Sequence, residues 1–126
     1  MIFTVNGELY SSKNSRQIFF NPKTGRRFVA KSDVAKQDER ELYNKLSNIK
    51  SSFLTVSKGK LRPLRVRFKI YRKTRHIFDY VNIIQNLLDS MVKVGLLPDD
   101  NANEIIPVFD PYELDPIKPR VEMEIL

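Results

Sequence analysis

Acidic side chains in the second half of the chain are the residues best suited to chemistry. Asp79 and Asp89 lie on one stripe of a segment with helical periodicity, and Asp99-Asp100 follow the end of that segment. Because a helix rises about 1.5 Å per residue, Asp79 and Asp89 would stand about 15 Å apart and could not share an ion. A chain that doubles back after the helix would instead bring Asp99-Asp100 to Asp79. Carboxylates bind Mg²⁺ or Mn²⁺, which can activate water for phosphodiester hydrolysis.

Other catalytic chemistries find little support in the sequence. The chain has no cysteine, so disulfides, thiolate metal sites and cysteine nucleophiles are excluded. The four glycines are scattered and form no phosphate-binding loop, and the single histidine has no adjacent serine in a nucleophile motif. A metal site formed by side-chain oxygen atoms is the catalytic chemistry that the sequence still allows.

Each of these polar residues also has a plain structural interpretation. Asp79 opens a helical segment, where aspartate is a common N-cap. The run Asp99-Asp100-Asn101 has the composition of a solvated turn. For His76, a phosphate contact or an ordinary loop position is a better interpretation than a general base.

Charge is segregated along the chain. Residues 1–75 hold 19 Lys/Arg and 5 Asp/Glu, a net charge of +14, whereas residues 76–126 hold 3 Lys/Arg and 10 Asp/Glu, a net charge of −7. A basic half suits a polyanion such as nucleic acid. An acidic half in the same protein would repel phosphate unless a metal ion bridges the two. The opposed halves therefore favour metal-dependent action on nucleic acid over a solvated surface without a role.

Periodicity predicts one small domain of α/β or α+β class over residues 1–126, with a mixed sheet flanked by two main helices. The expected elements are strands at 2–5, 17–20, 27–30, 64–71, 104–109 and 121–126, a helix from Ser32 or Asp33 to about Ile49, and a helix over 79–94. Residues 50–63 have the polar and basic composition of a connection. No stretch is apolar enough to span a membrane and no signal peptide opens the chain, so we expect a cytoplasmic protein.

Two segments combine basic residues with apolar ones. The segment 64–71 alternates, which predicts a strand with one buried side (Leu64, Val66, Phe68, Ile70) and one basic side (Arg65, Arg67, Lys69, Tyr71). Residues 8–31 indicate a long loop or a loose hairpin around a turn at 21–25. Its basic residues are interleaved with phenylalanines, which either belong to the core or help an extended arm to follow a nucleic-acid backbone.

In order and spacing, these motifs resemble those of the RusA family of Holliday junction resolvases. The run from Phe78 to Asn82 resembles that family's Asp-x-Asp-Asn motif at a helix start. The stretch from Leu88 to Gly95 resembles its Asp-Ala-Leu-like segment, and Asp99-Asp100 its later pair of aspartates. Residues 12–16, the run Gly25-Arg26-Arg27 and the helix from Asp33 are similar to its basic arm and first helix, so the resemblance covers nearly the whole chain.

The resemblance implies a homodimer that cuts paired strands of four-way DNA junctions with Mg²⁺ or Mn²⁺, of bacterial, phage or prophage origin. It implies Asp79, Asp99 and Asp100 as catalytic residues, and Asp79, Asp100 and Asn82 as metal ligands. The residues expected to bind the phosphates of branched DNA are Lys13, Arg16, Arg26, Arg27, Arg72, Lys73 and Arg75.

Two positions depart from the family pattern. Val81 stands where the family has its second motif aspartate, and Gln85 stands where a lysine often follows. The first change removes a carboxylate that would hold cations, and the second removes a cation that would stabilise transition-state charge. The sequence therefore supports three hypotheses: a junction endonuclease, a junction- or DNA-binding protein that has lost cleavage, and a small basic RNA-binding protein.

Overall fold

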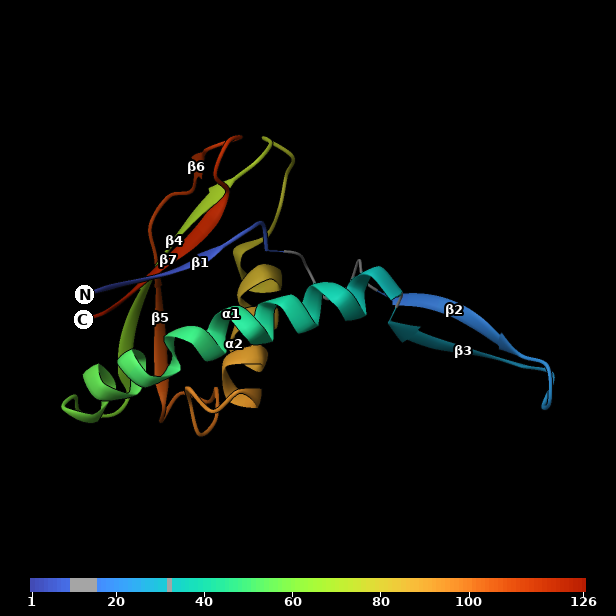
Figure 1. Cartoon of the computed structure of the whole chain (residues 1–126), viewed down its shortest axis with the longest axis horizontal. Helices are drawn as coiled ribbons and strands as arrows, with labels where there is room; N and C mark the ends of the chain where they lie inside the picture. Colours follow the sequence, from blue (N-terminus) through green and yellow to red (C-terminus); the bar gives the residue numbers. More distant parts are fainter. Residues whose placement is uncertain (10–15, 32) are drawn as a thin grey trace.

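A computed structural model describes residues 1–9, 16–31 and 33–126 of the chain (Figure 1). The described elements are β1 (Ile2–Asn6), β2 (Arg16–Asn21), β3 (Arg26–Lys31), α1 (Asp33–Lys58), β4 (Leu64–Arg72), α2 (Tyr80–Lys93), β5 (Ile105–Phe109), β6 (Glu113–Leu114) and β7 (Arg120–Ile125). They form a five-stranded mixed sheet, a separate two-stranded hairpin and two helices, which confirms the expected α+β class with one mixed sheet.

The long strand β4 organises the mixed sheet. Its neighbours are β7, which runs antiparallel to it, and β5 and β6, which run parallel to it. Strand β1 pairs with the far side of β7 and forms one edge of the sheet. Because β4 and β5 are parallel, the chain between them must cross over the sheet, and α2 is that crossover. Strand β6 is only two residues long, and the sequence pattern did not predict it.

Alternation in β4 and β7 builds one side of the core. The predicted buried positions of β4, Leu64, Val66, Phe68 and Ile70, are all buried, which confirms the strand and its orientation. Helix α2 covers them with the face predicted from its spacing, since Ile83, Ile84, Leu87, Leu88 and Met91 are buried and Tyr80 is partly buried. The bounds of α2 lie within one residue of the expected helix over 79–94.

Helix α1 extends well beyond its predicted end. It runs to Lys58, so the expected end near Ile49 is wrong, and the connection expected over 50–63 is confirmed only for residues 59–63. The polar and basic composition of residues 50–58 belongs to the solvated side of the helix, while Phe53 and Ser57 continue the buried stripe of Leu42 and Leu46. The Phe53 ring packs on Phe3 of β1 with 5.3 Å between ring centroids. No glycine or proline interrupts the helix before Gly59.

Strands β2 and β3 form an antiparallel hairpin that extends away from the rest of the molecule (Figure 1). The hairpin confirms the two extended segments expected around 21–25. Its turn is closed by a hydrogen bond from the amide of Gly25 to the carbonyl of Asn21 (2.8 Å), and the Asn21 side chain accepts one from the amide of Lys23 (3.0 Å). Gly25 has φ +70°, a conformation that glycine adopts without strain.

Within the described ranges, neither helix is both long and apolar enough to cross a membrane.

The packing of the second half of α1 gives a stability prediction. Phe53→Ala should lower the free energy of unfolding by about 3–5 kcal/mol, because it removes a fully buried ring and leaves a cavity against β1. The measurement is urea denaturation followed by circular dichroism. Leu54→Ala is the matched control, since that neighbouring side chain is 37% exposed, and it should cost about 1 kcal/mol or less. Equal losses in the two variants would contradict the packing described here.

Candidate functional site

Asp79 stands at the N-terminal end of α2, as the motif predicts. It occupies the N-cap position, but its carboxylate makes no capping hydrogen bond to the backbone of the helix. Instead, the side-chain amide of Asn82 donates a hydrogen bond to a carboxylate oxygen of Asp79 (3.3 Å). The Asp79 side chain is exposed, so two of the predicted oxygen ligands lie together and face solvent at this end of the helix.

Asp99 and Asp100 lie beyond the opposite end of α2. The Asp99 carboxylate accepts hydrogen bonds from the amide of Asp100 (2.7 Å) and from the side chain of Asn101 (3.1 Å), and the first of these contributes most to lowering the pKa of Asp99. The pKa of Asp100 is raised, first by partial burial and then by the neighbouring carboxyl groups of Asp99 and Asp89. Three acidic residues are therefore crowded at the C-terminal end of α2.

The contact between Asp100 and Asp89 determines which acidic residues can meet. Asp89 lies ten residues along α2 from Asp79, which corresponds to about 15 Å. Asp79 and Asp100 consequently lie at opposite ends of the helix, and one chain does not bring the predicted ligands Asp79, Asn82 and Asp100 to a common ion. Across residues 1–9, 16–31 and 33–126, no group of three or more His, Cys, Asp or Glu side chains is arranged to hold a metal ion.

The loop after α2 explains why the chain does not double back. Gly95, with φ +87°, ends the helix, and the side chains of Leu96 and Leu97 that follow are buried in the core. The carbonyl of Asn101 then accepts hydrogen bonds from the amides of Glu104 and Ile105, which lead directly into β5. The acidic pair is thus held at the C-terminal end of the helix by buried residues before it and a sheet strand after it.

The two departures from the family pattern lie on the exposed side of α2. Val81, two residues after Asp79, is 69% exposed, and Gln85 is exposed about one turn after Val81. A carboxylate at position 81 would have stood beside Asp79 and Asn82. The N-terminal end of α2 therefore carries one carboxylate and one amide.

Five of the seven predicted phosphate-binding residues lie in the hairpin or in the segment after β4. Arg26 and Arg27 are exposed in the hairpin, and Lys73 and Arg75 are exposed in the segment after β4. Arg16 begins β2, at the base of the same hairpin. Lys13 lies outside the described residues.

Arg72 is a correction to the predicted DNA-binding set. Its side chain is 8% exposed and forms an ion pair with Glu8 (3.4 Å) and a hydrogen bond to the carbonyl of Leu9 (3.3 Å). Its guanidinium carbon lies 4.5 Å from the ring centroid of Phe78. Arg72 therefore ties the segment after β1 to the end of β4. The alternation that buries Leu64 to Ile70 extends to position 72, and this signal in the sequence could have identified its burial.

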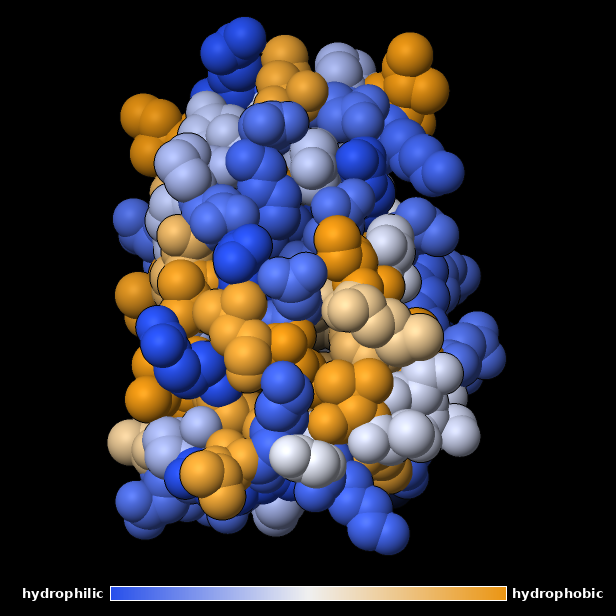
Figure 2. Space-filling model, turned by 90° about the vertical axis from the view of Figure 1, so that its left-hand side faces the viewer, coloured by the Kyte–Doolittle hydropathy of each residue, from blue (hydrophilic) through white to orange (hydrophobic). Residues whose placement is uncertain are grey.

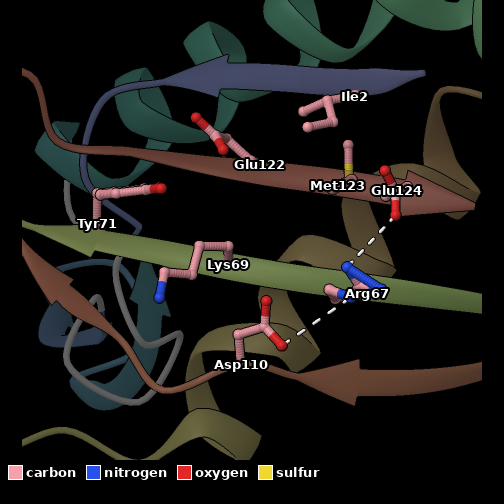
Figure 3. Close-up of a pocket in the computed structure, with 8 residues that line it drawn as sticks. All are labelled: Ile2, Arg67, Lys69, Tyr71, Asp110, Glu122, Met123 and Glu124. Atoms are coloured by element: carbon pink, nitrogen blue, oxygen red, sulfur yellow. Dashed lines mark ion pairs between the residues drawn. The ribbon is translucent and has the colours of Figure 1, made fainter.

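The outer face of the sheet carries the predicted basic stripe of β4, and two of its cations, Arg67 and Lys69, form ion pairs with carboxylates. The helices lie behind the sheet in Figure 3, and the residues drawn there line a shallow hollow of about 200 Å³ on the open face. Arg67 pairs with Glu124 (3.4 Å) and Asp110 (4.0 Å), and Lys69 pairs with Glu113 (3.2 Å). Carboxylates of neighbouring strands thus neutralise these two residues.

Figure 2 shows the side of the molecule where both chain ends lie, and hydrophobic groups interrupt its hydrophilic surface. Among the residues exposed in the described chain are the apolar Ile2 of β1 (56%) and Ile106 of β5 (43%). Hydrophobic groups therefore divide the hydrophilic surface on this side. Unbalanced positive charge is found instead on the hairpin, which has five Lys/Arg and no Asp/Glu between residues 16 and 31.

The structural role of Arg72 predicts that its removal destabilises the fold. Arg72→Ala should lower the free energy of unfolding by about 3–5 kcal/mol, because the largely buried carboxylate of Glu8 loses its partner. Thermal and urea denaturation measure this loss. Lys73→Ala, one residue along and exposed, is the control and should leave stability nearly unchanged. Adding Glu8→Gln to Arg72→Ala should recover part of the loss. A fully stable Arg72→Ala variant would contradict this role.

The chain matches no protein-family model and no curated protein sequence. The resemblance to the RusA family therefore stays a prediction from the motifs.

Proposed function

We propose that the protein binds branched DNA, with the hairpin β2–β3 and the segment 73–75 as its main contacts to phosphate. The observation that carries this proposal is the charge of the projecting hairpin, which is entirely positive. Positive residues that neutralise phosphates release condensed counterions, which supplies much of the affinity of proteins for DNA. A projecting arm can approach a duplex without bringing the acidic end of α2 near its phosphates.

The lack of carboxylates in its sequence distinguishes the hairpin from the basic residues of β4, which form ion pairs. Phosphate contacts by Arg67 or Lys69 would compete with the carboxylates that already pair with them. The hairpin contains no carboxylate of its own, and its tip residues Lys23, Arg26 and Arg27 are exposed. Lys73 and Arg75 add exposed positive charge outside the sheet face. These five residues are the best placed to meet a DNA backbone.

The branched form of the DNA and a homodimeric assembly rest on the resemblance to the junction resolvases. A two-fold dimer would present two hairpins related by symmetry, which matches the two-fold symmetry of a four-way junction. Recognition would then depend on the shape and phosphate positions of the junction more than on base sequence. Preference for hairpin RNA over junction DNA would contradict this choice of ligand.

Salt dependence of binding tests the role of the hairpin. The double variant Arg26→Ala, Arg27→Ala should bind a four-way junction more weakly, and the slope of log affinity against log salt should fall by about 2, one for each lost phosphate contact. Fluorescence anisotropy with a labelled junction gives both quantities. The double variant Lys60→Ala, Lys118→Ala is the control, since it removes the same charge from exposed positions outside the hairpin. An equal change in both variants would reject a specific role of the hairpin.

A second candidate function is metal-dependent cleavage of the junction, and one observation favours it. Asp79 with Asn82, and Asp100 with Asp89 and Asp99, lie at opposite ends of the same helix. In a two-fold dimer with the α2 helices antiparallel, each end of one helix would lie beside the other end of its partner. The carboxylates from two chains would then hold Mg²⁺, which in phosphodiester hydrolysis activates water and stabilises charge on oxygen.

A mixing experiment tests this composite site. Asp79→Asn and Asp100→Asn should each abolish Mg²⁺-dependent cleavage of a four-way junction when assayed alone. Co-expressed, they should recover part of it, because each mixed dimer contains one site with both native aspartates. Gel analysis of the cut strands measures the recovery, and Asp115→Asn is the control for loss of a carboxylate elsewhere. No recovery would contradict a site shared between chains. No cleavage by the native protein at any Mg²⁺ concentration would leave DNA binding as the function.

A further inference from the structure

An exposed aromatic ring lies near the tip of the hairpin. The Phe20 side chain is 62% exposed, and among the phenylalanines whose side chains the structure describes it is the one that faces solvent. Phe3, Phe53 and Phe68 are buried, and the two others are packed against the core. The ring therefore contributes nothing to the described core, and its position needs another explanation.

The register of the hairpin places Phe20 beside a cation. Phe20 pairs with Arg27 across the two strands, and the next pair, Asn21 with Arg26, leads into the turn that contains Lys23. Directly paired residues project from the same face of a hairpin, so Phe20 and Arg27 share one face while Asn21 and Arg26 share the other. The tip thus combines an aromatic ring with basic residues on both faces and in the turn.

The dimensions of the hairpin suit insertion into nucleic acid. Strands of six residues extend about 20 Å, which carries the tip well away from the body of the molecule. A two-stranded ribbon fits the major groove of DNA, which is about 12 Å wide. Aromatic side chains and guanidinium groups stack on the faces of bases, but in a continuous duplex those faces already stack on one another. They become accessible where strands part.

We propose that the hairpin tip recognises an unstacked base at a branch point, with the Phe20 ring stacked on the base and Arg27 and Lys23 on the flanking phosphates. This inference rests on the proposed DNA binding and adds the structural feature of the DNA that is recognised. Apolar side chains are known to enter disrupted base steps as wedges, and this requires an exposed ring on an element that can reach the step. Phe20 meets both conditions.

The experiment compares binding of Phe20→Ala to a four-way junction and to a linear duplex of the same length. The variant should lose affinity for the junction by about tenfold and keep its affinity for the duplex, because only the junction offers an unstacked base. Phe20→Trp should retain junction affinity, since its ring also stacks. Ile117→Ala, which removes an even more exposed apolar side chain (96%) outside the hairpin, should change neither affinity.

A spectroscopic readout separates stacking from general contact. With 2-aminopurine at the branch point, the native protein and Phe20→Trp should quench or shift its fluorescence, and Phe20→Ala should not. Equal loss of affinity for junction and duplex in Phe20→Ala would overturn the stacking role while DNA binding stands. No binding of either DNA by the native protein would overturn the proposed function and this inference together. A change in oligomeric state caused by Phe20→Ala, with the ratio of junction to duplex affinity unchanged, would assign the ring to contact between copies and overturn the inference.

Discussion

The strict alternation of buried and more exposed side chains along β4 is the constraint on which the rest of the structure depends. Its inward side chains form the floor of the core, and its backbone pairs with three other strands. Because β5 is parallel to β4, the intervening chain must cross the sheet, and the apolar face of α2 is what covers that floor. The same period extends to Arg72, which is buried only because Glu8 and Leu9 supply a carboxylate and a carbonyl for its guanidinium. The buried face of β4 and its parallel pairing with β5 thus determine where α2 packs, and the burial of Arg72 determines how the segment after β1 is attached.

The straight helix α2 then determines which carboxylates can meet. It places Asp79 about 15 Å from Asp89, and so separates the pair of Asp79 and Asn82 from the group of Asp89, Asp99 and Asp100. Buried leucines and the start of β5 hold the acidic loop at the C-terminal end of the helix. The pKa of Asp100 is raised there, first by partial burial and then by the neighbouring carboxyl groups of Asp99 and Asp89. A second chain, or a ligand with positive charge, is what could relieve this crowding.

Ion pairs between side chains of neighbouring strands determine where positive charge on the surface remains unbalanced. On the open sheet face, glutamates of β6 and β7 lie opposite the basic residues of β4, and the charges cancel locally. In the hairpin, by contrast, both strands are basic and no acidic residue is available to pair. A protein with a modest net charge of +7 can therefore present a strongly positive arm while the rest of its surface is mixed. The proposed nucleic-acid binding depends on where positive charge remains unbalanced rather than on the total charge.

Local patterns in the sequence determined most of the elements and one site feature. The alternation of β4, the apolar face of α2 and the turn between β2 and β3 depend on neighbours a few residues away, so their periods predict them. The same holds for Asp79 and Asn82, which lie one helical turn apart and do contact each other. The polar composition of residues 50–58 hides the second half of α1, although Phe53 continues its apolar spacing and packs on Phe3.

Only the tertiary structure shows that the predicted acidic residues lie at two ends of α2, and which basic side chains form ion pairs with carboxylates. The sequence allowed Asp99-Asp100 to return to Asp79, but the burial of Leu96 and Leu97 directs that loop to Asp89. It also presented Arg67 and Lys69 as a free basic stripe, whereas strands β6 and β7, distant in the chain, supply their carboxylate partners. Contacts of this kind depend on strand order and register, which bring together residues whose separation along the chain carries no periodic signal.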